Sequence, residues 1–234
     1  MRKTKLIVAL DTPDLKTAGV LLKKLKGLPV IYKVGSSLFT LAGPGAVDLV
    51  HKHGGKVFLD LKFYDIPNTV RNAVESAARL GVYSVSLHLS GGAEMLRAAA
   101  ELKNRPLLWG ITVLTSFDEK AFIRAGFRGG IGKTIFSLAA LGAENGADGL
   151  VCSPLEAAAV KKRFGKAFEI ITPGIRLSAG TDDQKRTLTP AGAAAAGAGF
   201  IVVGRPVLNA PDPAAVVREI LGRLKAIGHD TALV

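Results

Sequence analysis

The sequence predicts an α/β fold, a closed (β/α)8 TIM barrel that forms a single domain over residues 1–234. Short apolar runs rich in β-branched residues recur eight times, and segments with helical periodicity lie between them. Strands that alternate with helices indicate right-handed βαβ units and a parallel sheet. Eight such units in 234 residues match this barrel in number and in length, and polar residues gather where the runs end.

The apolar runs are the expected strands. In chain order they cover residues 5–10, 30–35, 56–61, 83–89, 107–114, 149–153, 168–174 and 200–204. An open, doubly wound sheet is the alternative, because it is built from the same strand–helix units.

The carboxyl ends of the runs favour the barrel over the open sheet. Polar side chains or glycines stand there: Asp11, Lys33, Asp60, Lys62, His88, Thr115, Ser116, Arg176, Gly204 and Arg205. In a barrel these ends converge on one rim, which is where active sites of this fold lie, whereas an open sheet would spread them along a line.

Helices are expected between the runs. Residues 69–81 carry an apolar stripe, and Gly81 supplies a C-terminal cap. Thr189 is expected to cap a helix that begins at Pro190. The small-residue stretch 191–199 predicts a helix packed closely on the last strand.

Composition limits the function classes. The net charge of +12 leaves a nucleic-acid-binding barrel as an alternative, which predicts salt-sensitive binding. Against it, Lys and Arg are scattered through every segment, and no basic run is interleaved with aromatics. No apolar stretch approaches the roughly 20 residues of a membrane span, and the apolar run near the start is too short for a signal peptide. The single cysteine, Cys152, excludes an internal disulfide and favours a buried thiol in a cytoplasmic protein.

The segment DLKFYDIPNT, residues 60–69, follows the apolar run VFL directly. Side chains alternate faces along a strand, so if Phe58 points into the barrel, Asp60 and Lys62 do so too. An acid and an amine would then lie side by side on the inner face. A structural salt bridge is the alternative interpretation.

Charged residues expected on the neighbouring strands indicate that Asp60 and Lys62 are more than a structural salt bridge. Asp11 and Lys33 are expected at the same level of the barrel, which gathers several charges at one place. Asp65 lies beyond the strand, and it could fold back towards this site or reach across an interface. Pro67 is expected to open the next helix.

Taken in order, these motifs resemble the orotidine 5′-phosphate decarboxylase family over nearly the whole chain. The resemblance is carried by IVALD with Asp11, YKVG with Lys33, DLKFYDIPNT, VLTS with Thr115 and Ser116, TPGIR with Arg176, DQKRTLTP with Gln184, and VVGRP with Gly204 and Arg205. The resemblance implies decarboxylation of orotidine 5′-monophosphate (OMP) to UMP and CO2 without a metal or an organic cofactor.

The resemblance also implies the catalytic residues. Lys62 would stabilise negative charge at C6 of the pyrimidine and protonate that carbon. Asp60 and Asp65 would keep Lys62 charged and aimed, and Lys33 would complete an alternating Lys-Asp-Lys-Asp network. In the family the last Asp comes from the other subunit, which implies a homodimer. The resemblance then assigns Asp65, Ile66 and Thr69 to the neighbouring subunit's site.

Other residues of the rim are expected to bind the substrate. Asp11 and Lys33 would bind the ribose, and Thr115 and Ser116 the pyrimidine. Arg205 would bind the phosphate, together with the region of Gly204 and with Gln184. Arg176 is a further expected substrate-binding residue, and residues 178–189 have the length and composition of a lid.

Alternatives remain at this point. A Mg²⁺-dependent sugar-phosphate decarboxylase or aldolase of the same barrel group also uses a D-x-K-x-x-D strand, with carboxylates that bind the metal. The DIPNT, LTS and DQKR stretches favour the nucleotide enzyme. The stretch FRGGIGKT, residues 127–134, nearly matches a P-loop but lacks its first glycine and a preceding strand. His88 is expected to be an inner-face histidine rather than a catalyst.

Overall fold

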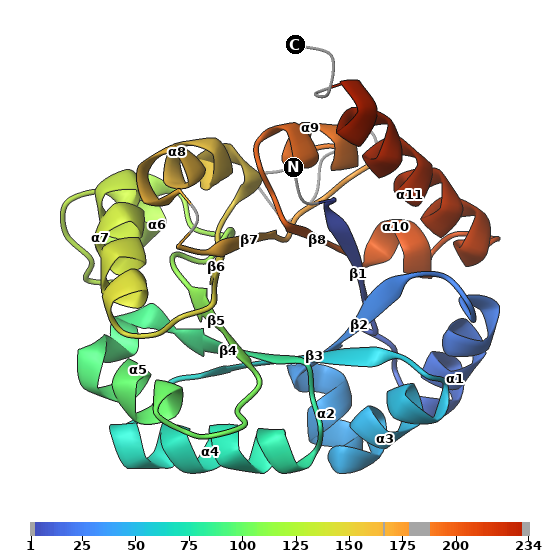
Figure 1. Cartoon of the computed structure of the whole chain (residues 1–234), viewed down its shortest axis with the longest axis horizontal. Helices are drawn as coiled ribbons and strands as arrows, with labels where there is room; N and C mark the ends of the chain where they lie inside the picture. Colours follow the sequence, from blue (N-terminus) through green and yellow to red (C-terminus); the bar gives the residue numbers. More distant parts are fainter. Residues whose placement is uncertain (1–2, 166, 178–187, 231–234) are drawn as a thin grey trace.

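The computed structural model describes residues 3–165, 167–177 and 188–230. Within these residues eight parallel strands close into a barrel in chain order, with helices around the outside (Figure 1). The strands are β1 (Lys5–Ala9), β2 (Val30–Gly35), β3 (Lys56–Phe63), β4 (Ser84–His88), β5 (Leu107–Ile111), β6 (Gly149–Val151), β7 (Glu169–Thr172) and β8 (Phe200–Val203). The closed barrel is confirmed, and the open sheet is excluded because β1 also pairs with β8.

The helices lie between the strands, as expected. They are α1 (Leu15–Lys24), α2 (Ser36–Ala42), α3 (Pro44–Lys52), α4 (Pro67–Arg79), α5 (Gly92–Ala100), α6 (Glu119–Arg124), α7 (Ile131–Glu144), α8 (Pro154–Phe164), α9 (Pro190–Ala195), α10 (Arg205–Leu208) and α11 (Pro213–Asp230), with a short 3-10 turn η1 (Leu89–Gly91).

Helix ends follow local chemistry. Pro67 opens α4, and Gly81, with φ +69°, follows its end in the left-handed region that glycine tolerates. The Thr189 hydroxyl accepts a hydrogen bond from Gly192 N at the start of α9. The small-residue stretch is shorter than expected as a helix, because α9 ends at Ala195 and Gly197 turns with φ +89°.

Side chains pack in two layers. Large residues such as Phe58, Trp109 and Phe200 fill the inside of the barrel, with ring centroids of Trp109 at 4.5 Å from Phe58 and 5.0 Å from Phe200. A second, larger core lies between the strands and the helices. Leu59 belongs to this outer core, so β3 alternates as expected, with Phe58 inside and Leu59 outside.

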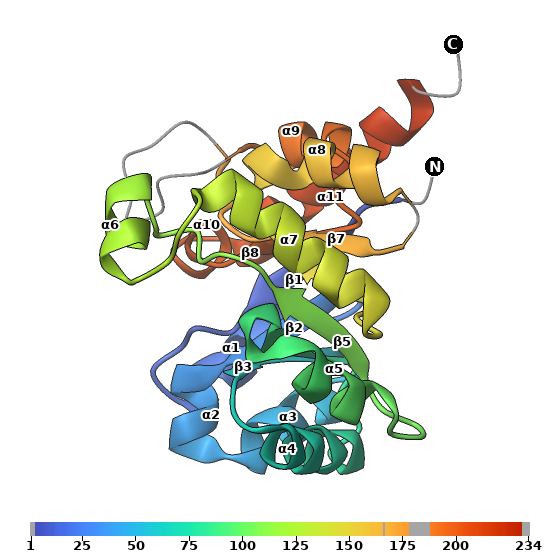
Figure 2. The same ribbon diagram turned by 90° about the vertical axis from the view of Figure 1, so that its left-hand side faces the viewer.

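The segments that follow the carboxyl ends of the strands form one rim of the barrel. In the side view, α6 and α10 lie at the end of the molecule away from the N-terminus (Figure 2). Both follow strand ends, β5 and β8 respectively. Among the described residues, none of the helices combines the length and the hydropathy that a membrane span requires.

Candidate active site

A cavity of about 530 Å³ lies at the carboxyl ends of the strands. Its floor is apolar, with Phe58, Ile171 and Val202 among the residues that line it. Its charged lining comprises Asp11, Lys33, Asp60, Lys62, Arg176 and Arg205. An apolar floor with convergent charged groups is typical of a site for a small polar ligand.

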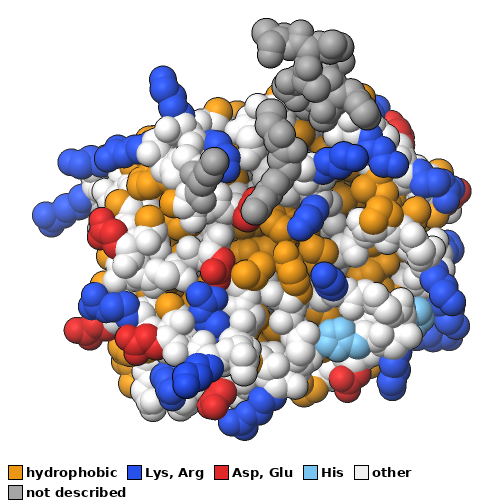
Figure 3. Space-filling view, viewed as in Figure 1, with side chains coloured by type: hydrophobic (Ala, Val, Ile, Leu, Met, Phe, Trp, Pro, Cys, Tyr) orange, Lys and Arg blue, Asp and Glu red, His pale blue; other side chains and the backbone are white. Residues whose placement is uncertain are grey.

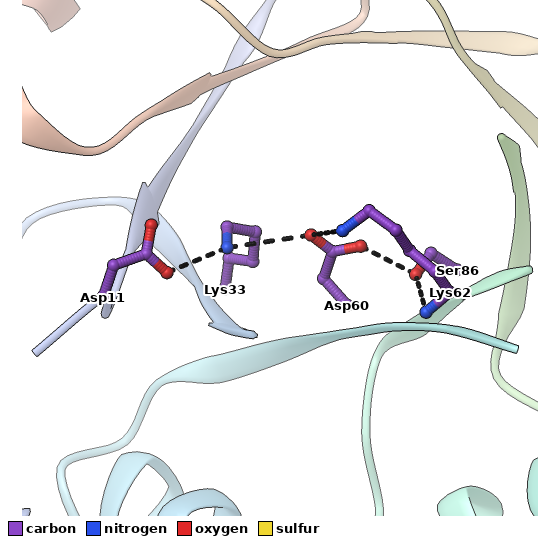
Figure 4. A network of polar contacts seen from close by, with 5 residues as sticks. All are labelled: Asp11, Lys33, Asp60, Lys62 and Ser86. Atoms are coloured by element: carbon purple, nitrogen blue, oxygen red, sulfur yellow. Dashed lines mark hydrogen bonds and ion pairs between the residues drawn. The ribbon is translucent and has the colours of Figure 1, made fainter. Parts of the chain in front are cut away.

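Four charged side chains form a row across this cavity (Figure 4). Lys33 Nζ lies 3.0 Å from Asp11 Oδ1 and 3.7 Å from Asp60 Oδ2. Lys62 Nζ lies 3.1 Å from the same Asp60 oxygen. The predicted gathering of charges from three neighbouring strands is therefore confirmed, in the order Asp11, Lys33, Asp60, Lys62.

Asp60 is the most buried member of the row, with 8% of its surface exposed. Burial alone would raise the pKa of its carboxyl. The charges of Lys33 and Lys62, together with the hydrogen bonds from Ser86 and Lys62, lower the pKa by more than burial raises it. The pKa of Asp60 therefore lies below its ordinary value. Asp60 is thus an anion at neutral pH. Its charge is balanced by two ammonium groups, which is what makes a buried carboxylate tolerable at this position.

Lys62 departs from regular strand geometry. Its φ is +52°, in the left-handed region that costs a non-glycine residue about 1–2 kcal/mol. The pairing of β3 with β4 shifts register between Leu59 and Phe63, so Lys62 lies in an irregular stretch of the strand. Strained backbone of this kind is concentrated at functional sites.

Ser86 supports this irregular stretch. Its hydroxyl donates to Asp60 Oδ1 at 2.7 Å and accepts from Lys62 N at 2.9 Å (Figure 4). The sequence motifs do not single out Ser86. The available signal is the alternation in SVSLH, which puts Ser84 and Ser86 on the inner face of β4.

The remaining wall of the cavity contains several of the predicted binding residues. Thr115, Arg176, Gly204 and Arg205 line it. Gly35, which we did not predict, also matters, because a Cβ there would lie 2.9 Å from Lys33 Nζ. A side chain at this position would therefore require the Lys33 ammonium to shift.

Other predicted site residues are not brought to the cavity within one chain. Asp65 is exposed, and its carboxylate accepts a hydrogen bond from the adjacent Ile66 N at 2.7 Å. Ile66 is 67% exposed, and Thr69 is exposed on α4. Ser116 lies outside the cavity lining. Gln184 and residues 178–187 of the expected lid lie outside the described residues.

His88 lies at the end of β4, half-buried, with its ring 5.6 Å from that of Tyr64. Burial lowers the pKa of His88, and the charge of Lys62 lowers it further, while Asp60 acts in the opposite direction. The imidazole is therefore neutral at neutral pH. Cys152 is buried, as expected, and borders the cavity.

The P-loop-like stretch 127–134 begins α7. The Glu119 carboxylate accepts hydrogen bonds from Ile131 N at 3.1 and 3.3 Å. The first turn of this helix is therefore engaged by an acid of the same chain, where a P-loop would hold phosphate.

The carboxylates of the row do not form a metal cage. Lys33 Nζ lies between Asp11 and Asp60, where a divalent cation bound by both acids would have to lie. In the part of the chain that the structure describes, no group of three or more His, Cys, Asp and Glu residues could hold a metal ion.

Basic residues on the face drawn in Figure 3 are scattered rather than gathered in a stripe. Lys and Arg side chains lie both along its outline and near its centre, and acidic side chains lie among them. A groove for nucleic acid would instead need a continuous basic track.

Comparison with known proteins adds to this geometry. A sequence model of the family described as Orotidine 5'-phosphate decarboxylase / HUMPS family matches residues 4–220. The orotidine 5'-phosphate decarboxylase of Nitratidesulfovibrio vulgaris (strain DP4) is 47% identical over 233 residues, which is 95% of this chain and 98% of that protein. The enzyme of the same name from Trichlorobacter lovleyi is 44% identical over 232 residues, 96% of each chain. A crystal structure of orotidine 5'-phosphate decarboxylase from Lactobacillus acidophilus is similar with a TM-score of 0.84 and 34% identity, over 94% of this chain and 99% of that one.

Proposed function

Because this chain belongs to the orotidine 5′-phosphate decarboxylase / HUMPS family, its reaction is the decarboxylation of OMP to UMP and CO2 in pyrimidine biosynthesis, and we propose that Lys62 and Asp60 carry that reaction. The observation that supports these roles is the contact between Lys62 Nζ and Asp60 Oδ2, 3.1 Å, inside a cavity that both residues line.

The reaction leaves an electron pair on C6 of the pyrimidine. No carbonyl adjacent to C6 can delocalise these electrons as it would in a β-keto acid. The protein must therefore stabilise the charge electrostatically and supply a proton, which together lower the barrier by on the order of 20 kcal/mol. The Lys62 ammonium can do both, since it is a cation and a proton donor.

Asp60 keeps the Lys62 ammonium in place through their ion pair. Lys33 contacts the same carboxylate oxygen from the other side and bridges to Asp11. Asp60 would also face the carboxylate of the substrate. Two such charges about 4 Å apart repel by roughly 4 kcal/mol at an effective dielectric constant of 20. This repulsion is relieved when CO2 leaves, but it is too small to be the main cause of catalysis.

Substrate recognition falls to the residues around the row. Asp11 and Lys33 bind the ribose hydroxyls, Thr115 and Ser116 the pyrimidine, and Arg205 the phosphate. Phosphate binding near β8 agrees with the usual position of this site in barrels, after strands seven and eight. Gly204 and Gln184 assist Arg205. Arg176, which also lines the cavity, is a further substrate-binding residue.

Asp65, Ile66 and Thr69 complete the site of a second subunit in a homodimer. Their exposure on one protomer supports this role, as does the 61% exposure of the adjacent Tyr64. Large exposed apolar side chains in one segment are typical of an interface. Asp65 of one subunit would then provide the last acid of the network around the other subunit's Lys62.

Residues 1–234 form one catalytic domain in this proposal, in a cytoplasmic protein. The single cysteine is consistent with a reducing compartment. The reaction needs neither a metal nor an organic cofactor.

A spectrophotometric assay with OMP tests the proposal directly. The protein is expected to convert OMP to UMP, and prior treatment with EDTA should leave the rate unchanged. Absence of turnover, or turnover that Lys62→Ala retains, would contradict the roles of Lys62 and Asp60.

A further inference from the structure

Ser86 lies on the inner face of β4, two residues before His88. It is fully buried, and it is not among the residues that line the cavity. A substrate in the cavity therefore cannot contact its hydroxyl directly. Any effect of Ser86 on the reaction must pass through the residues that it binds.

Ser86 binds two residues of the adjacent strand with one oxygen. Its hydroxyl donates to Asp60 Oδ1 at 2.7 Å, and it accepts from the backbone N–H of Lys62 at 2.9 Å. The hydroxyl thus uses both its donor and an acceptor position. Figure 4 shows it at the Lys62 end of the row, between the Asp60 carboxylate and the backbone nitrogen of Lys62.

Because of the hydrogen bond from Ser86 to Asp60, the two oxygens of the carboxylate have different partners. Oδ1 is held by Ser86, while Oδ2 receives Lys62 Nζ at 3.1 Å and Lys33 Nζ at 3.7 Å. A carboxylate can rotate about its last bond. The Ser86 bond fixes this rotation, so that one oxygen faces both lysines.

The second bond acts on the backbone of Lys62. This residue has φ +52°, where the β3–β4 ladder is irregular. The Ser86 hydroxyl satisfies the Lys62 N–H, which would otherwise lack a ladder partner at the shift of register. The orientation of the Lys62 side chain follows from this backbone conformation.

We propose that Ser86 is a positioning residue for the decarboxylation, which aims the Asp60 carboxylate and holds the backbone from which Lys62 reaches the substrate. The inference rests on the proposed function, in which Asp60 and Lys62 act on OMP. It adds a residue that does not touch the substrate but sets the geometry of the two residues that do.

The test compares three variants of the full chain. Ser86→Ala removes the hydroxyl. Ser86→Cys retains the volume but replaces the hydroxyl by a weak donor. Ser84→Ala is the matched control, because Ser84 lies on the same face of β4, is equally buried, and has a hydroxyl without a hydrogen-bond partner.

Steady-state kinetics with OMP and calorimetric binding of UMP are the measurements. We expect Ser86→Ala and Ser86→Cys to lower kcat by about 10- to 100-fold, as a small misplacement of reacting groups does. The KM for OMP and the Kd for UMP should stay within about threefold, since ground-state binding is retained. Ser84→Ala should keep kcat within about twofold. Intact UMP binding also shows that each variant is folded.

A pH profile separates positioning from a structural effect. The Ser86 hydrogen bond is one of the interactions that lower the pKa of Asp60. In Ser86→Ala the acid limb of kcat should therefore move to higher pH, because Asp60 takes up a proton more readily. The charged and titratable groups around Asp60 are Lys33 and Lys62, which pair with it, and His88, on which its charge acts; Asp11 is connected to it through Lys33. All of these groups remain in both variants, but only Ser84→Ala keeps the Ser86 hydroxyl, so its profile should match that of the parent.

The inference is overturned if Ser86→Ala keeps kcat within threefold of the parent, or if its acid limb does not move. The inference is also overturned if Ser86→Cys has the kcat of the parent, because the volume of the side chain and not its hydrogen bonds would then matter. A decrease of kcat in Ser84→Ala as large as that in Ser86→Ala would overturn it too. Failure of the proposed function is distinguishable, because it requires an inactive parent or an active Lys62→Ala variant.

Discussion

The ammonium of Lys62 folds back onto the carboxylate of Asp60, two residues earlier in β3, with 3.1 Å between Nζ and Oδ2. In a regular strand these side chains would point in parallel from the same face. Here Lys62 has a left-handed backbone, with φ +52°, and its ammonium contacts the carboxylate. The pair therefore lies in the irregular stretch of β3, where the pairing with β4 shifts register.

Replacement of Lys62 by alanine should abolish turnover, because it removes both the proton donor and the cation at C6. We expect kcat to fall by at least about 10⁴-fold, the combined effect of lost general acid and electrostatic catalysis. UMP should still bind. Lys56→Ala is the control, since Lys56 is an exposed lysine at the opposite end of the same strand and should be dispensable. Near-normal kcat in Lys62→Ala would rule out this mechanism.

Replacement of Arg205 by alanine should remove the contribution of the substrate's phosphate group to kcat/KM. We expect kcat/KM for OMP to fall by the equivalent of roughly 2–5 kcal/mol, as for other lost charged contacts. With the nucleoside orotidine, which lacks the phosphate, the same substitution should have little effect. Arg218→Ala on α11 is the control. An equal loss with both substrates would show that Arg205 does not act through the phosphate.

Two inactive variants should complement each other if the site is shared between subunits. Lys62→Ala and Asp65→Ala are each expected to be inactive. In a mixed two-fold dimer, one site carries both substitutions and the other carries neither, so mixing after unfolding and refolding should restore roughly a quarter of the parent activity. No recovery would mean that Asp65 acts within its own chain or not at all.

Stability should depend on pH through Asp60. Its pKa in the folded protein lies below its ordinary value. Its stabilisation is therefore complete above the unfolded pKa, about 4, and is lost as the pH falls through the lower folded value. Urea unfolding between about pH 6 and about pH 3 should show this loss, and Asp60→Asn should reduce the slope. Asp48→Asn on α3 controls for removing an exposed negative charge. Equal slopes in the parent and Asp60→Asn would contradict the prediction.

Removal of divalent cations should not affect turnover. Lys33 occupies the position between Asp11 and Asp60 that a metal would need. We expect the OMP decarboxylation rate after EDTA treatment and gel filtration to equal that of the untreated protein. Loss of activity that Mg²⁺ restores would instead support the metal-dependent chemistry of the related sugar-phosphate enzymes.

Sequence patterns predicted most of the fold. The apolar runs and the helical stripes are local signals, because each strand or helix must bury one side of a periodic pattern. The same alternation correctly assigned Phe58 to the inside of the barrel and Leu59 to the outside. Pro67 and Thr189 marked helix starts for reasons that lie within a few residues of each.

By itself, the sequence determined the barrel, the strand ends, and the gathering of Asp11, Lys33, Asp60 and Lys62 on one rim. Only the tertiary structure decided how these charges pair, and that Ser86 binds both Asp60 and Lys62. The physical reason is that a hydrogen bond between β3 and β4 depends on the shift of register between these two strands. Alternation along β3 shows which face each residue takes, whereas the shift is a property of its pairing with β4.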